Sequence, residues 1–209
     1  MTRIWIGLFA MFLSAASLSG QQEGLYGSKA PEDAAFVRIL NSGTSSLPPV
    51  PVGATRFERL SPGDVSPYRV LSPGVLIVRA REGEVDIAAG PGEYYTVVVS
   101  DAGPSVFRDR RHDDPLRAQL ILYNLTEISP VTLKTADGGT EVIPEISTGE
   151  SASVAVNPVK ARLALFSGGD RLAEVGAIDM DSGQSYGIFT MERSGGPEIL
   201  VEQAEVDAK

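Results

Sequence analysis

The sequence predicts an all-β protein built from two tandem small antiparallel β-sandwich domains. Short β-type runs recur along the chain, turn-forming pairs separate them, and no stretch shows sustained helical periodicity. Strands at this spacing between turns are typical of a sandwich or a barrel. The clearest expected strands are 36–40, 76–80, 94–99, 119–123, 161–166 and 186–191. The turn pairs are Pro62-Gly63, Pro73-Gly74, Pro91-Gly92, Gly138-Gly139 and Gly168-Gly169.

An internal repeat indicates that there are two domains. Four segments of the first half recur in the same order in the second half, at offsets of 83, 85, 91 and 93 residues. Rising offsets are expected when insertions accumulate in the second copy of a duplicated domain. Each copy buries only a modest core, so we expect the domains to lean on each other or on a partner. The matched segments are 35–41 with 118–124, 72–73 with 157–158, 92–98 with 183–189, and 103–104 with 196–197.

Residues 1–20 are expected to be a cleaved signal peptide. Arg3 supplies the positive region, 4–13 is an uncharged apolar run, and 14–20 consists almost entirely of small residues. The apolar run is half as long as the roughly twenty residues that a membrane span needs. We therefore expect export to the periplasm, cleavage after Ser19 or Gly20, and no transmembrane segment in the mature protein.

The remaining boundaries follow from the repeat and from one charged segment. Residues 109–115 are charged, lack apolar side chains and end in Pro115, which indicates an interdomain linker at 109–117. An N-terminal leader at 21–34 precedes the first sandwich at 35–108, and the second sandwich occupies 118–209.

Composition excludes several classes of function. The chain contains no cysteine, which excludes disulfides, thiolate metal sites and a cysteine nucleophile. Removing the signal peptide leaves 17 basic and 27 acidic side chains, a net charge of −10. A chain with this charge repels nucleic acid at long range, so we expect no nucleic-acid partner.

One motif points to a hydrolase and is better explained by a turn. Gly183-Gln184-Ser185-Tyr186-Gly187 matches G-x-S-x-G, which in serine hydrolases lies between a strand and a helix, with a histidine downstream. Here an acidic turn precedes the motif and a strand is expected after it. The only histidine, His112, lies upstream in the expected linker. We therefore expect Ser185 to begin a strand, and we assign no catalytic residue.

Metal and cofactor sites are not expected either. His112 with Asp113 and Asp114 makes a poor preformed metal site, because a single histidine stands beside mobile carboxylates. The pattern Asp179-x-Asp181-x-Gly183 lacks the later carboxylates of a calcium loop. No dinucleotide or phosphate-binding fingerprint follows any expected strand. We expect no cofactor and no metal.

The start of the expected mature chain carries a family resemblance. Residues 24–31 (GLYGSKAP) lead directly into 33–41 (DAAFVRILN), and the match continues through 65–68 (VSPY) and 92–96 (GEYYT). This pattern resembles the AlgF family of periplasmic alginate O-acetylation proteins. The resemblance is densest over 24–100 and thin over the second half. Ser28 stands where the family pattern has proline.

The resemblance implies a non-catalytic adaptor in alginate O-acetylation. Its partners would be a membrane-bound O-acyltransferase, which supplies acetyl groups, and periplasmic acetyltransferases, which transfer them. Two alternatives stay open, a polysaccharide-binding protein that holds alginate and an acetyl-carrier enzyme. Against alginate binding, the mature chain and the polymer are both anionic. The expected partner-binding residues are Leu25, Tyr26, Gly27, Arg108, Arg110 and Arg111.

Overall fold

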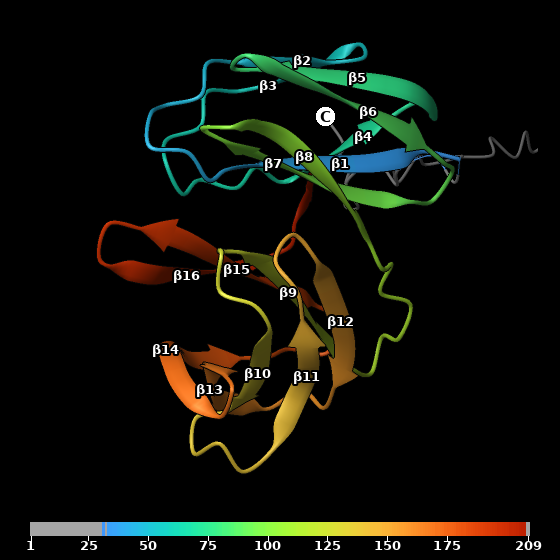
Figure 1. Ribbon diagram of the computed structural model, residues 1–209. Coiled ribbons are helices and arrows are strands. Elements are labelled where there is room, and N and C mark those ends of the chain that lie inside the picture. Colours follow the sequence, from blue (N-terminus) through green and yellow to red (C-terminus); the bar gives the residue numbers. More distant parts are fainter. Residues whose placement is uncertain (1–30, 32, 208–209) are drawn as a thin grey trace, which may run out of the picture.

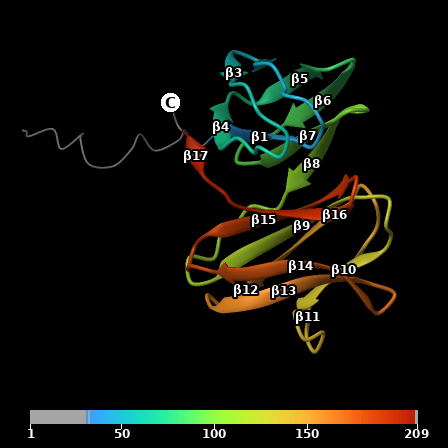
Figure 2. The ribbon, with the colours of Figure 1, turned by 90° about the vertical axis from the view of Figure 1, so that its left-hand side faces the viewer.

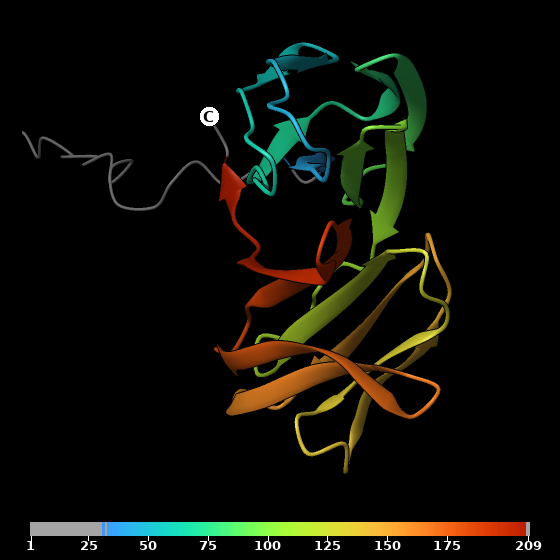
Figure 3. The same ribbon diagram turned by 60° about the vertical axis from the view of Figure 1, so that its left-hand side comes forward.

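The computed structural model describes residue 31 and residues 33–207 of the 209-residue chain. Over this range the regular structure consists of strands only, arranged in four sheets. Figures 1, 2 and 3 show the sheets stacked as four layers, two for each sandwich. No helix among these residues is long and apolar enough to cross a membrane.

The first sandwich pairs the sheet β17-β4-β1-β7-β8 with the sheet β3-β2-β5-β6. Its interior holds the inward-facing side chains of both sheets, including Val37, Val78 and Val97, all of them fully buried. The strands are β1 (Ala35–Asn41), β2 (Val50–Val52), β3 (Thr55–Phe57), β4 (Tyr68–Leu71), β5 (Gly74–Ala80), β6 (Gly83–Ala89), β7 (Tyr94–Ser100) and β8 (Gly103–Asp109), with β17 (Val206–Asp207) added from the other end of the chain.

The second sandwich has the same strand order. The sheet β12-β9-β15-β16 corresponds to β4-β1-β7-β8, and β11-β10-β13-β14 corresponds to β3-β2-β5-β6. The strands are β9 (Ala118–Leu125), β10 (Val131–Thr135), β11 (Glu141–Ile146), β12 (Ser151–Val156), β13 (Lys160–Ser167), β14 (Asp170–Asp179), β15 (Ser185–Arg193) and β16 (Gly196–Gln203). The predicted fold class, two tandem all-β sandwiches, is confirmed. One detail differs, because β1 pairs with β7 and β9 with β15 in parallel.

Two equivalent tyrosines show the repeat at the level of single bonds. The Tyr95 hydroxyl donates to the Ala88 carbonyl at 2.9 Å, and the Tyr186 hydroxyl donates to the Asp179 carbonyl at 3.1 Å. Both side chains are buried, and each hydroxyl ties the start of its strand to the preceding chain. The repeat predicted from the sequence aligns these two residues with each other.

A third apolar cluster joins the sandwiches. It consists of buried side chains from β1, β7 and β8 together with buried side chains from β9 and β15, namely Leu40, Val98, Phe107, Ile121, Tyr123, Phe189 and Met191. We call the surface where the sheet β4-β1-β7-β8 faces the sheet β12-β9-β15-β16 the seam.

Two segments expected outside the first sandwich are part of it. Asp109, expected to begin the linker, is the last residue of β8 and is only 7% exposed. The C-terminal strand β17, expected in the second sandwich, pairs in parallel with β4 of the first. Arg69 and Asp207 form an ion pair of 3.1 Å across this ladder.

Candidate functional site at the seam

The alternation of side chains along β1 places an arginine at the seam. Because successive side chains of a strand point to opposite faces, Val37 and Ile39 enter the core of the first sandwich. Arg38 points the other way and is 1% exposed. The equivalent strand β9 turns Tyr123 toward it from the second sandwich, and Tyr123 is fully buried.

Hydroxyl groups connect Arg38 to a buried carboxylate. Arg38 donates from Nε to Thr96 Oγ1 at 2.9 Å and from Nη2 to the Tyr123 hydroxyl at 3.0 Å. Thr96 Oγ1 donates to Asp109 Oδ2 at 2.6 Å, and the Tyr123 hydroxyl donates to Asp109 Oδ1 at 2.5 Å. The Tyr68 hydroxyl donates to Asp109 Oδ2 at 2.8 Å. We call these five residues the seam cluster.

The seam cluster is built around a buried guanidinium group and a buried carboxyl group. Burial raises the pKa of the Asp109 carboxyl, and this shift is opposed by Arg38 and the three hydroxyl donors. Burial alone would lower the pKa of Arg38, but Tyr123, Tyr68 and Asp109 offset it, so its pKa is raised. Arg38 therefore stays charged, and leaving it without its partners would be costly.

Aromatic rings and a glycine complete the packing around Arg38. Its guanidinium carbon lies 4.6 Å from the centre of the Tyr68 ring and 5.3 Å from that of Phe189. A Cβ atom on Gly187 would lie 3.1 Å from Arg38 Nη2 and 2.9 Å from Phe189 Cε2. Gly187 is the last glycine of the G-x-S-x-G motif, so packing at the seam accounts for it.

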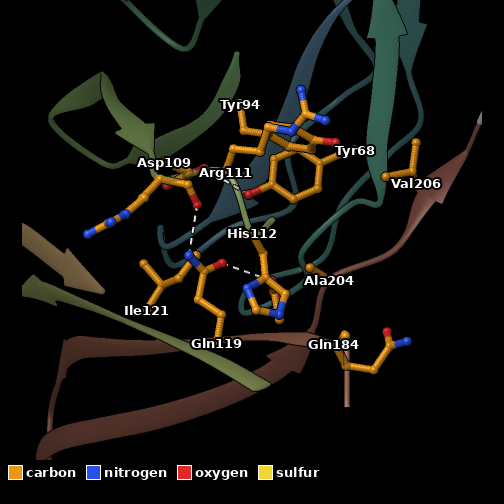
Figure 4. Close-up of a pocket in the computed structure, with 13 residues that line it drawn as sticks. Tyr68, Tyr94, Asp109, Arg111, His112, Gln119, Ile121, Gln184, Ala204 and Val206 are labelled. Carbon is orange, nitrogen blue, oxygen red and sulfur yellow. Dashed lines mark hydrogen bonds between the residues drawn. The ribbon is translucent and has the colours of Figure 1, made fainter. Parts of the chain in front are cut away.

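A cavity of about 170 Å³ opens beside the seam cluster (Figure 4). Both sandwiches and the segment that joins them contribute to its walls. The lining residues are Tyr68, Tyr94, Asp109, Arg110, Arg111, His112, Gln119, Ile121, Gly183, Gln184, Ser185, Ala204 and Val206.

The structure brings Ser185 and His112 to this one cavity, although they are far apart in the sequence. They are not hydrogen-bonded to each other. Ser185 Oγ donates to Gln119 Oε1 at 2.8 Å, and His112 Nε2 lies 2.8 Å from the Arg117 carbonyl oxygen. As expected from the sequence, Ser185 begins a strand, β15, and not a strand–turn–helix elbow.

The three arginines expected to bind a partner have different surroundings. Arg108 forms an exposed ion pair with Glu93, and Arg111 forms one with Asp113 at 2.7 Å. The Arg110 carbonyl accepts a hydrogen bond from Gln119 Nε2 at 2.9 Å. Arg110 and Arg111 line the cavity, whereas Arg108 does not.

Other expected sites can be placed only in part. The expected docking residues Leu25, Tyr26 and Gly27 lie outside the described residues. Within the described part of the chain, no group of three or more histidine, aspartate or glutamate side chains could hold a metal ion.

Sequence reasoning missed the seam cluster. The available signal was Arg38, a single charge inside the apolar run 35–40. A charged residue in such a strand must be paired if it is buried. Its partner Asp109 could not be found in this way, because it stands among the charges that indicate a linker.

Comparison with known proteins identifies the family. The family model described as "Alginate O-acetyl transferase AlgF" matches residues 10–187. "Alginate biosynthesis protein AlgF" of Pseudomonas aeruginosa is 31% identical over 189 residues, covering 89% of this chain and 87% of that protein. The protein of the same name from Azotobacter vinelandii is 31% identical over 180 residues, covering 86% of this chain and 82% of its own length.

Two solved domains of P. aeruginosa AlgF also resemble parts of the chain. The C-terminal domain matches with a TM-score of 0.39 and 27% identity, covering 42% of this chain and 98% of that domain. The N-terminal domain matches with a TM-score of 0.35 and 31% identity, covering 39% of this chain and all of that domain. The family match extends over most of the sequence, from the segment before the first sandwich to β15. The chain belongs to the AlgF family, whose named members are alginate biosynthesis proteins.

Proposed function

We propose that this protein is a non-catalytic periplasmic adaptor in the O-acetylation of alginate. In this role it links a membrane-bound O-acyltransferase, which supplies acetyl groups, to the periplasmic acetyltransferases that transfer them. Family membership supports the pathway. The signal-peptide pattern of residues 1–20 supports the compartment.

The seam is the observation that carries the adaptor role. An adaptor that orients two partners needs its two binding surfaces in one relative arrangement. Here the apolar cluster and the seam cluster bury side chains of both sandwiches against each other, and β17 adds a second crossing. A buried, hydrogen-bonded polar network favours one relative orientation of the two parts.

The arrangement of reactive groups supports a role without chemistry of its own. An acyl-enzyme mechanism needs the serine hydroxyl within hydrogen-bond reach of its base. Ser185 donates to Gln119 and His112 contacts a backbone carbonyl, so the two are directed to different partners. Asp109 is directed to the seam hydroxyls and is not available to orient the histidine.

The surface charge disfavours the polysaccharide-binding alternative. Arg108 and Arg111 are each matched by a carboxylate, from Glu93 and Asp113. Binding of a polyanion would have to break these pairs as well as overcome the net negative charge of the chain.

Complementation tests whether this chain takes part in acetyl transfer as a catalyst. A strain that lacks this gene is supplied with wild type, Ser185→Ala or His112→Ala, and acetyl groups on the secreted alginate are quantified. We expect both variants to restore acetylation to the wild-type level at equal protein abundance. Loss of acetylation by a variant that is folded and abundant would show that the chain supplies chemistry itself.

A further inference from the structure

A groove runs between the two sandwiches along one side of β16. Leu200 and Glu202 of β16 line one side of it, and residues 57–69 of the first sandwich line the other. Its volume is about 580 Å³, larger than that of the cavity beside His112. Figures 1 and 2 show β16 on the side of the second sandwich that faces the first. We call this space the β16 groove.

In the part of the chain that the structure describes, no strand pairs with the outer edge of β16. Among the described residues, β16 forms a ladder only with β15. Ala204 N donates to Ser185 O at 2.8 Å, which shows which residues of this ladder form the hydrogen-bonded pairs. Because antiparallel pairs alternate in their bonding, the amides and carbonyls of Ile199, Val201 and Gln203 point away from β15. Such an edge is a template for another strand.

The side chains of β16 are also less covered than those of its neighbour. Ile188 and Phe189 of β15 are fully buried, whereas Ile199, Leu200 and Val201 are only half-buried. A strand added beside β16 would extend both the core of the second sandwich and the apolar cluster of the seam. The added strand would therefore bury apolar area as well as form backbone hydrogen bonds.

Charge defines what kind of strand fits. Among the described residues, the groove is lined by the carboxylates of Glu58, Asp64, Glu202 and Asp207, and by one cation, Arg69, which pairs with Asp207. Partial burial raises the pKa of the Glu202 carboxyl. A cation placed beside it would act in the opposite direction and favour its charged form. Basic side chains complement this lining, and acidic ones are repelled by it.

We propose that the β16 groove binds an extended basic segment of a partner protein by strand addition to the free edge of β16. The chain already uses this mode of pairing beside the groove, where β17 adds in parallel to β4. The binding mode depends only on the edge of β16 and the groove. That the partner is a component of the acetylation machinery rests on the proposed adaptor function.

Peptide titration of the full chain, followed by amide chemical shifts, tests the binding mode. The probe is an alternating Lys-Val peptide as long as β16, which has 8 residues. The matched control is a Glu-Val peptide of the same length. We expect shifts at β16 and residues 57–69, and at least about tenfold tighter binding of the Lys-Val peptide. Equal affinity for both peptides, or shifts elsewhere only, would overturn the proposal.

Two variants, each with a matched control, test separately the contribution of the free backbone amides and that of the groove charges to peptide binding. Gln203→Pro removes an outward amide without breaking the ladder to β15, and Gln203→Ala keeps that amide. Glu202→Lys reverses a charge in the groove, and Glu192→Lys makes the same change on an exposed residue outside it. We expect Gln203→Pro and Glu202→Lys to weaken Lys-Val binding about tenfold, and the controls to match wild type. Unchanged binding by Gln203→Pro and Glu202→Lys would overturn the proposal.

The same variants distinguish this proposal from the adaptor function. The experiment is co-purification of the O-acyltransferase and the acetyltransferases with this chain. If wild type and both groove variants capture these proteins equally well, the adaptor function is supported and the groove proposal is wrong. If wild type captures neither, the adaptor function is wrong whatever the peptide does. If wild type dimerises in sedimentation and Gln203→Pro abolishes the dimer, the groove serves a second copy of the chain and the proposal is wrong.

Discussion

At the scale of single residues, the seam depends on Asp109. Three hydroxyl groups donate to the two oxygens of its carboxyl group. We expect Asp109→Asn to lower the free energy of unfolding by about 1–3 kcal/mol, because an amide nitrogen replaces one of the oxygens that accept from these buried hydroxyl groups. Urea denaturation measures this loss. The exposed Asp113→Asn is the control, and equal stability of the two variants would contradict the role of the seam cluster.

The stability difference between wild type and Asp109→Asn should depend on pH in a defined direction. Burial raises the pKa of Asp109 in the folded state, so the folded chain holds this proton more tightly than the unfolded chain. The contribution is fully present below the unfolded pKa of about 4 and is lost as pH rises through the higher folded pKa. The stability difference between wild type and Asp109→Asn should therefore shrink as pH is raised from about 4 toward neutrality. A difference that grows over this range in urea titrations would contradict the assignment.

The two repeat tyrosines should respond alike. Replacing Tyr95 or Tyr186 by alanine empties a buried aromatic site, which typically costs about 3–5 kcal/mol. Replacement by phenylalanine removes only the hydroxyl and its hydrogen bonds to the preceding chain, including the bond from Tyr95 to Glu93, with an expected cost of about 1–2 kcal/mol in each copy. Denaturation of the four variants checks this. A loss confined to one copy would show that the two positions are not equivalent.

At the scale of elements, local pattern predicted the strands well and their pairing poorly. The run 94–99 is rich in β-branched and aromatic residues, and β7 covers it completely. The parallel pairing of β7 with β1 joins residues more than fifty positions apart, and no local pattern specifies it. The two-residue strand β17 had no sequence signal at all, because its pairing depends on the position of β4 in the folded chain.

The strand β17 gives a test at this scale. It covers the edge of β4, where the Tyr68 amide donates to the Glu205 carbonyl at 2.8 Å. A chain that ends at Gln203 lacks this cover, so we expect the amide of Tyr68 to exchange with solvent faster by at least about tenfold. Hydrogen exchange followed by mass spectrometry or NMR measures it, with β5 amides as internal reference. Unchanged protection of β4 would show that β17 does not hold this edge.

At the scale of the whole molecule, the sequence indicated two domains and did not indicate how they join. Residues 109–115 have the composition of a linker, and most of their side chains are exposed. Asp109 and the two sides of the seam come from strands far apart in the sequence, so only the folded chain brings them together. The same holds for Ser185 and His112, which share a cavity that the order of residues gave no reason to expect.

The proposed adaptor function requires this chain to be a physical link between two other proteins. The most direct measurement immobilises the detergent-solubilised O-acyltransferase and quantifies capture of a periplasmic acetyltransferase with and without the purified full chain. We expect capture that requires this chain and persists with Ser185→Ala. Equal capture in the absence of the chain, or failure of the chain to bind both proteins at once, would contradict the adaptor function.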